Sequence, residues 1–115
     1  MTYPQAISLP GPAWKVNGGT NPVRGVVLHS VVGTFEGAMA ELDKPSRRAS
    51  WHYTIKQDGT CYVHYPDAAQ CWHAGSIRNN DTVAVEHEGG AIGNESEPLT
   101  PAQLASSQAL VWWLS

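Results

Sequence analysis

The stretch WHYTIKQDGTCYVHYP, residues 51–66, constrains the fold more than any other part of the chain. Asp58-Gly59 is a strong hairpin-turn signal, and the segments on both sides are rich in β-branched and aromatic residues. Pro66 ends the returning strand because proline cannot donate a hydrogen bond to a strand ladder. The stretch therefore predicts an antiparallel β-hairpin.

The register of this hairpin decides whether its two histidines can meet. A loop of two or four residues centred on the turn places His52 opposite Tyr65, and His52 and His64 then point to opposite faces of the sheet. A loop of three residues reverses that outcome. With the shorter or longer loop, we expect no metal site built from both histidines.

Two further stretches predict strands. Residues 25–30 are apolar without alternation, which is typical of a central strand covered on both faces, and this strand delivers His29 to its end. In TVAVEHE, residues 82–88, alternation places Val83, Val85 and His87 on one face and Ala84, Glu86 and Glu88 on the other.

Two helices are predicted from capping signals. Thr34 caps a helix with apolar positions Phe35, Met39 and Leu42, and Pro45 ends it. Thr100, with Pro101 and Gln103, forms a capping box that opens a second helix, whose apolar stripe is carried by Leu104, Val111 and Leu114. The expected fold class is α/β (α+β), a mixed central sheet of about four to five strands with helices packed on it.

The size and charge of the chain limit its organisation and its partners. A chain of 115 residues suits one domain, 23–115, preceded by an irregular, Pro- and Gly-rich arm, 1–22. A formal net charge of −3 argues against a nucleic-acid partner. No apolar run is long enough for a membrane span, and the N-terminus lacks the pattern of a signal peptide. We expect a monomer.

Two cysteines, Cys61 and Cys71, are too few for a disulfide framework and lack zinc-knuckle spacing. Free thiols are favoured, and a single bridge between them stays open.

His29 and Glu86 are the candidate chemical groups. A histidine at the end of a buried strand is either a metal ligand or proton carrier on a rigid support, or a core-edge residue satisfied by hydrogen bonds. A glutamate on an apolar strand is costly to bury without a partner, so a functional role is favoured over a solvated strand end.

Four phrases in order strengthen this interpretation: VVLHS, SWHYTIKQDGTCYVHYPD, CWHAG followed by Asn79, and TVAVEHEGG. Together they resemble the zinc-dependent N-acetylmuramoyl-L-alanine amidases, a family that includes phage lysozyme-type amidases and peptidoglycan recognition proteins. The similarity runs from about residue 23 to the end of the chain.

The resemblance implies a role for each matching residue. His29 looks like the first ligand of a Zn2+ cofactor, and Glu86 like the glutamate that activates the zinc-bound water. Trp72, His73 and Asn79 look like residues that line the substrate groove. Trp51 stands where some members carry an oxyanion-stabilising tyrosine, and it suits groove lining and core packing equally well.

The resemblance also implies a deficit. The family completes its zinc site with a second His and an Asp or Cys after the helix that begins at Thr100, and this chain ends at Ser115. Among the remaining histidines, only His73 is a plausible helper. We therefore expect 23–115 to be an amidase-like catalytic domain that lacks its C-terminal segment.

The implied function is a peptidoglycan hydrolase that cleaves the amide between N-acetylmuramic acid and L-alanine of the stem peptide, incomplete as this chain. Such an enzyme acts on the cell wall, as a phage endolysin or bacterial autolysin does. The alternative is a non-catalytic module that binds peptidoglycan or muropeptides. A serine hydrolase using Ser30 is disfavoured, because neighbouring strand residues point to opposite faces and there is no nucleophile elbow.

Overall fold

The computed structural model describes residues 2–31, 33–73, 79–89 and 98–115. Its centre is a five-stranded sheet in the order β1-β5-β4-β7-β3. Only β4 and β5 pair antiparallel, and the other neighbours are parallel. The sheet is therefore mixed, which confirms the predicted fold class. Its strands are β1 (Ile7–Ser8), β3 (Gly25–Val31), β4 (Tyr53–Ile55), β5 (Cys61–Val63) and β7 (Thr82–Glu88).

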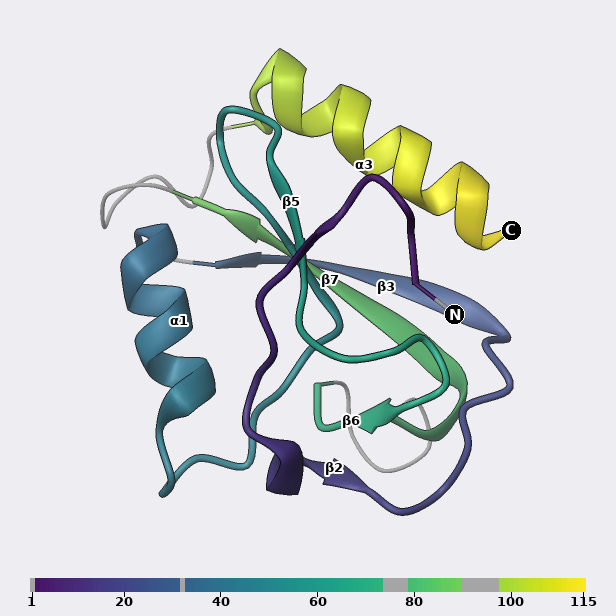
Figure 1. The fold of residues 1–115 in the computed structure, drawn as a ribbon. Helices are drawn as coiled ribbons and strands as arrows, with labels where there is room; N and C mark the ends of the chain where they lie inside the picture. The colour runs from purple at the N-terminus through teal and green to yellow at the C-terminus, as the bar shows by residue number, and fades with distance from the viewer. Residues whose placement is uncertain (1, 32, 74–78, 90–97) are drawn as a thin grey trace.

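One helix covers each face of the sheet (Figure 1). On one face, Ala38 and Leu42 of α1 (Phe35–Asp43) pack in a cluster that includes Ala84 of β7. On the other face, Leu110 of α3 (Pro101–Leu114) packs against β4, β5 and β7. Alternation along β7 therefore places Glu86 on the α1 side and His87 on the α3 side.

The predicted helix starts are confirmed, whereas the predicted buried stripe of α3 is only partly right, since Leu114 packs against the core and Leu104 does not. Thr34 accepts a hydrogen bond from Gly37 N–H, and Thr100 with Gln103 forms the complete capping box. The face of α3 that meets the sheet carries Gln103, Ser107 and Leu110, while Leu104 is 47% exposed. The hydrophobic pattern missed the buried Gln103, whose amide donates to two strand carbonyls, those of Ile55 and Glu88.

The expected hairpin register is wrong by one residue. Ile55 lies opposite Cys61 and Tyr53 opposite Val63, so the loop between Lys56 and Thr60 has three residues. Gly59 adopts a φ of 90°, a left-handed conformation typical of three-residue hairpin loops. His52 and His64 consequently lie across from each other, and His64 N–H donates to the His52 carbonyl.

The strand that ends near His29 is not central. β3 forms the edge of the five-stranded sheet, with β7 as its neighbour among the described strands. Leu28, on the α3 side, is 54% exposed. An unbroken apolar run fits a central strand, but the run alone does not report how many neighbours the strand has.

The N-terminal arm joins the fold at two points. β1 extends the main sheet beside β5, and β2 (Val16–Asn17) pairs with β6 (Gln70–Cys71) in a small antiparallel sheet. A 3-10 helix, η1 (Ala13–Lys15), lies between them.

Three further expectations concern chemistry and location. Cys61 and Cys71 are free and buried, as favoured. In the part of the chain that the structure describes, no helix is long and apolar enough to cross a membrane. The sequence GGAIGNESEP, residues 89–98, predicts a loop, and AQCWHAGSIRNND, residues 69–81, an aromatic loop; residues 90–97 of the first and 74–78 of the second lie outside the described residues.

Candidate functional site

A row of polar side chains crosses the sheet at one level on its α1 side. In the strand register, His29 of β3 lies beside Glu86 of β7, and Glu86 lies beside Thr54 of β4. His29 Nδ1 approaches Glu86 Oε1 at 3.9 Å, and the two side chains are 27% and 14% exposed. Parallel pairing of β3 and β4 on either side of β7 is what aligns these three residues.

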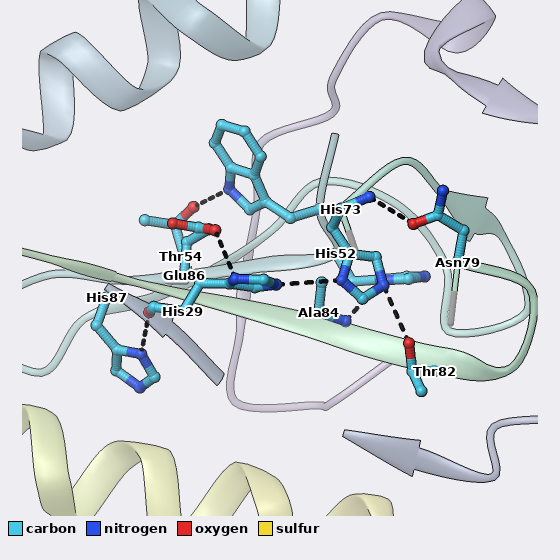
Figure 2. A network of polar contacts seen from close by, with 10 residues as sticks. His29, His52, Thr54, His73, Asn79, Thr82, Ala84, Glu86 and His87 are labelled. Carbon is cyan, nitrogen blue, oxygen red and sulfur yellow. Dashed lines mark hydrogen bonds and ion pairs between the residues drawn. The ribbon is translucent and has the colours of Figure 1, made fainter. Parts of the chain in front are cut away.

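His73 reaches the same row from the loop after β6. Its Nδ1 lies 3.2 Å from His29 Nε2, and its Nε2 lies 3.1 Å from the Thr82 hydroxyl (Figure 2). The backbone N–H of His73 donates to Asn79 Oδ1 at 2.7 Å, which fixes the loop where it meets the sheet. The structure thus brings together His29, His73, Asn79 and Glu86, four of the residues that sequence comparison with the family singled out.

Burial sets the protonation of this cluster. It raises the pKa of Glu86 to about 7, so the carboxyl group is present in both protonation states at neutral pH. Burial lowers the pKa of His29, and the neighbouring His87 lowers it further. For His73, burial and then the charges of His29 and His52 lower the pKa to about 4. Neutral imidazoles beside a half-ionised carboxyl group suit proton transfer near pH 7.

Trp51 is turned inward. It is 7% exposed, and its indole N–H donates to Thr54 Oγ1 at 2.8 Å. The Thr54 hydroxyl in turn donates to His64 Nε2, and His64 Nδ1–H donates to the Leu9 carbonyl. This chain of hydrogen bonds occupies the only donor of the Trp51 side chain. The indole N–H is therefore not free to meet a substrate carbonyl.

His52 is a structural residue. It is fully buried, its Nδ1 accepts from Ala84 N–H, and its Nε2–H donates to the Ala69 carbonyl. Both nitrogens of His52 and of His64 are therefore occupied. The corrected register brings the two residues opposite each other, yet it leaves neither with a nitrogen for a metal ion.

Sequence reasoning missed the residues that support the cluster. His87, on the opposite face, donates from Nδ1–H to the His29 carbonyl and accepts from the Ser107 hydroxyl of α3. Glu88 accepts from the backbone N–H groups of Phe35 and Gln57, which ties α1 and the hairpin loop to the end of β7. The only sequence signal for these roles is the alternation along β7, which separates His87 from Glu86 and Glu88.

The cluster does not form a complete metal site. No group of three or more His, Cys, Asp or Glu that could hold a metal ion occurs within residues 2–31, 33–73, 79–89 and 98–115. Ser30 lies in register with His87, so alternation turns it away from the cluster, and no serine–histidine pair forms with His29.

Comparison with known proteins places this geometry in context. A family model described as N-acetylmuramoyl-L-alanine amidase matches residues 19–115. N-acetylmuramoyl-L-alanine amidase A of Achromobacter lyticus is 28% identical over 113 residues, which cover 96% of this chain. The chain spans 63% of the length of that relative.

Solved structures share the fold. The endolysin amidase LysCS of Clostridium intestinale matches 98% of this chain and 74% of its own, with a TM-score of 0.68 and 19% identity. A selenomethionine derivative of AmpD matches 94% of this chain and 72% of its own, with a TM-score of 0.71 and 19% identity.

Proposed function

The chain belongs to the N-acetylmuramoyl-L-alanine amidase family, and from this we propose that it hydrolyses peptidoglycan at the amide between N-acetylmuramic acid and L-alanine of the stem peptide. The observation that carries the proposal is the Glu86 carboxyl group, which is 14% exposed and lies 3.9 Å from His29 Nδ1. Amide hydrolysis at neutral pH needs a group that both accepts and returns a proton. Burial raises the pKa of Glu86 to about 7, which suits both proton transfers.

Glu86 acts twice in the proposed reaction. As a carboxylate it takes a proton from the attacking water, and as a carboxylic acid it gives that proton to the nitrogen of L-alanine as the amide breaks. His29 shares its level on the sheet and lies 3.9 Å away, so it borders the position where the carbonyl group must sit. The hydrogen bond from His87 Nδ1–H to the His29 carbonyl holds β3 in place from the opposite face of the sheet.

His29 is the only described residue that we propose as a zinc ligand. When bound in such a site, Zn2+ polarises the carbonyl group and lowers the pKa of bound water. A catalytic zinc takes three protein ligands, and the described residues bring no three suitable groups together. They therefore do not fit a complete zinc site. We propose His29 as one ligand and assign no step to the metal.

We propose Trp72, His73 and Asn79 as substrate-contacting residues. His73 adjoins His29, its backbone N–H donates to Asn79 Oδ1, and Trp72 directly precedes it. Trp51, with its N–H engaged, serves instead as packing beneath the cluster. The site of action is the bacterial cell wall, and the proposed active unit is a monomer.

The test replaces Glu86 with Gln, which keeps the shape of the side chain and removes its proton transfer. The release of stem peptides from purified peptidoglycan falls by at least about 100-fold in Glu86→Gln. The matched control is Glu36→Gln, on the exposed side of α1, which keeps the parental rate. A rate in Glu86→Gln equal to that of the control contradicts the assigned role.

A second candidate function is a module that binds muropeptides without cutting them. The absence of a three-donor metal group among the described residues favours it. Two measurements on the parental chain separate the two functions. A module of this kind binds soluble muropeptides but releases no stem peptide from purified peptidoglycan.

A further inference from the structure

An aromatic surface includes Trp72, the residue that directly precedes His73 of the candidate site. Trp14 of η1 is 50% exposed, and its ring lies 6.5 Å from that of Trp72, centroid to centroid. The Arg48 guanidinium lies over the Trp72 ring, 5.5 Å from its centroid. We name these three residues, Trp14, Trp72 and Arg48, the aromatic platform. Trp72 directly precedes His73, whose ring meets His29, so the platform is linked through the chain to the proposed reaction site.

A single buried serine holds the platform together. Ser50 is fully buried; its hydroxyl donates to the Lys15 carbonyl and accepts from Trp72 N–H, and its own N–H donates to the Trp72 carbonyl. Three segments distant in sequence are thereby joined: η1, the stretch between α1 and β4, and the loop after β6. Figure 1 shows η1 beside the segment that leads from α1 toward β4. The backbone segments that carry the three platform residues are therefore held together in the folded chain before any ligand arrives.

The chemistry of the platform fits a sugar ring. One face of an N-acetylhexosamine exposes C–H groups, which pack on a flat indole ring, while the hydroxyl and acetamido oxygens at its edge accept hydrogen bonds. Arg48 is exposed and brings several N–H donors in a planar group. The neighbouring Arg47 pairs instead with Glu41, at 3.6 Å.

We propose that the aromatic platform binds an N-acetylhexosamine ring of the glycan strand, with Trp14 as the stacking surface and Arg48 as the hydrogen-bond donor. This inference rests on the proposed function in one respect: peptidoglycan joins the sugar directly to the group that carries the scissile amide. A sugar held on the platform and an amide at the His29–Glu86 pair then belong to the same substrate. The platform thus positions the glycan, and Glu86 acts on the bond.

The test uses chitotetraose, a glycan with no stem peptide and no lactyl amide, titrated into isotopically labelled protein. The indole N–H resonances of Trp14 and Trp72 shift on titration, and Trp14→Ala weakens the affinity about tenfold. Trp112→Ala is the matched control. Trp112 is 81% exposed on α3, and its replacement leaves the affinity for chitotetraose unchanged. Arg48→Gln weakens binding, whereas Arg47→Gln does not.

The outcomes separate this inference from the proposed function. Unshifted Trp14 and Trp72 resonances, or equal affinities in Trp14→Ala and Trp112→Ala, overturn the glycan assignment. If Trp14→Ala weakens the binding of a free stem peptide but not that of chitotetraose, the glycan assignment is also overturned. If chitotetraose binds through Trp14 while peptidoglycan stays uncut, the platform stands and the hydrolase proposal fails. Thermal unfolding of each variant verifies that it is folded.

Discussion

His52 shows how much a single buried side chain contributes to this fold. It is completely buried, and its two ring nitrogens bond to backbone groups of Ala84 and Ala69. These two bonds connect the start of β4 to β7 and to the segment before β6. The bond to Ala84 requires the neutral ring, because a protonated Nδ1 cannot accept from Ala84 N–H, whereas the Nε2–H bond to Ala69 is possible in both protonation states. The stability of the fold is therefore linked to the protonation of His52.

Burial lowers the pKa of His52 to about 4, from 6.5 in the unfolded chain. Between pH 6.5 and pH 4 the unfolded chain takes up a proton that the folded chain refuses, so stability is full above pH 6.5 and is lost as pH falls. We expect His52 to account for about 2 kcal/mol of the loss in the free energy of unfolding between pH 7 and pH 5. Urea unfolding at both pH values measures this loss.

His52→Gln serves as the comparison, because glutamine does not titrate. The variant is less stable at pH 7, and its further loss at pH 5 is smaller than that of the parent. An equal loss in both proteins would show that another group governs the acid sensitivity. Glu86, whose pKa is raised, opposes the histidines, since its protonation on acidification favours the folded chain.

Individual residues also show where sequence reasoning stops. The pattern of residues predicted that His29 and Glu86 matter, and the parallel register brings them together. The direction of the Trp51 indole was not predictable, because it depends on Thr54 and on His64 from the neighbouring strand. Contacts between side chains from different elements are set by tertiary packing, which a local pattern does not encode.

Among the helices and strands, the two helix starts provide a matched comparison. Thr34 caps α1 through one hydrogen bond, from Gly37 N–H. Thr100 takes part in a full capping box, and its hydroxyl also donates to the Gln57 carbonyl in the hairpin loop at 2.6 Å. Thr100 therefore joins α3 to the hairpin loop as well as starting the helix.

We expect Thr100→Ala to lower the free energy of unfolding by about 2 kcal/mol and Thr34→Ala by about 0.5–1 kcal/mol. The difference arises because Thr100→Ala also leaves the Gln57 carbonyl without this partner. Midpoints of chemical unfolding, compared at constant slope, give both values. Equal losses in the two variants would mean that the contact to the hairpin loop adds nothing.

The same elements explain why the helices were predictable and the hairpin register was not. Capping residues act within a few positions, so the start of α3 follows from Thr100 and Gln103 alone. The hairpin register depends on where Gly59 takes its left-handed conformation, and Asp58-Gly59 is compatible with loops of two, three or four residues. A shift of one residue then exchanges the two faces of the strand.

In the whole molecule, the mixed sheet with a helix on each face was predictable from the order of its segments. The position of β3 at the sheet edge was not, because strand order depends on parallel pairings between distant parts of the chain. The sheet and its two covering helices give the proposed site its rigidity. Three parallel strands hold His29, Glu86 and Thr54 at one level.

The most direct measurement is the chemical identity of the products released from purified peptidoglycan, determined by mass spectrometry. Hydrolysis at the proposed bond gives stem peptides that begin with a free L-alanine amino group, and glycan strands whose muramic acid keeps an intact lactyl carboxylate. Products cut within the glycan or within the peptide would contradict the proposed function. So would the absence of soluble product from the parental chain under conditions in which it binds muropeptides.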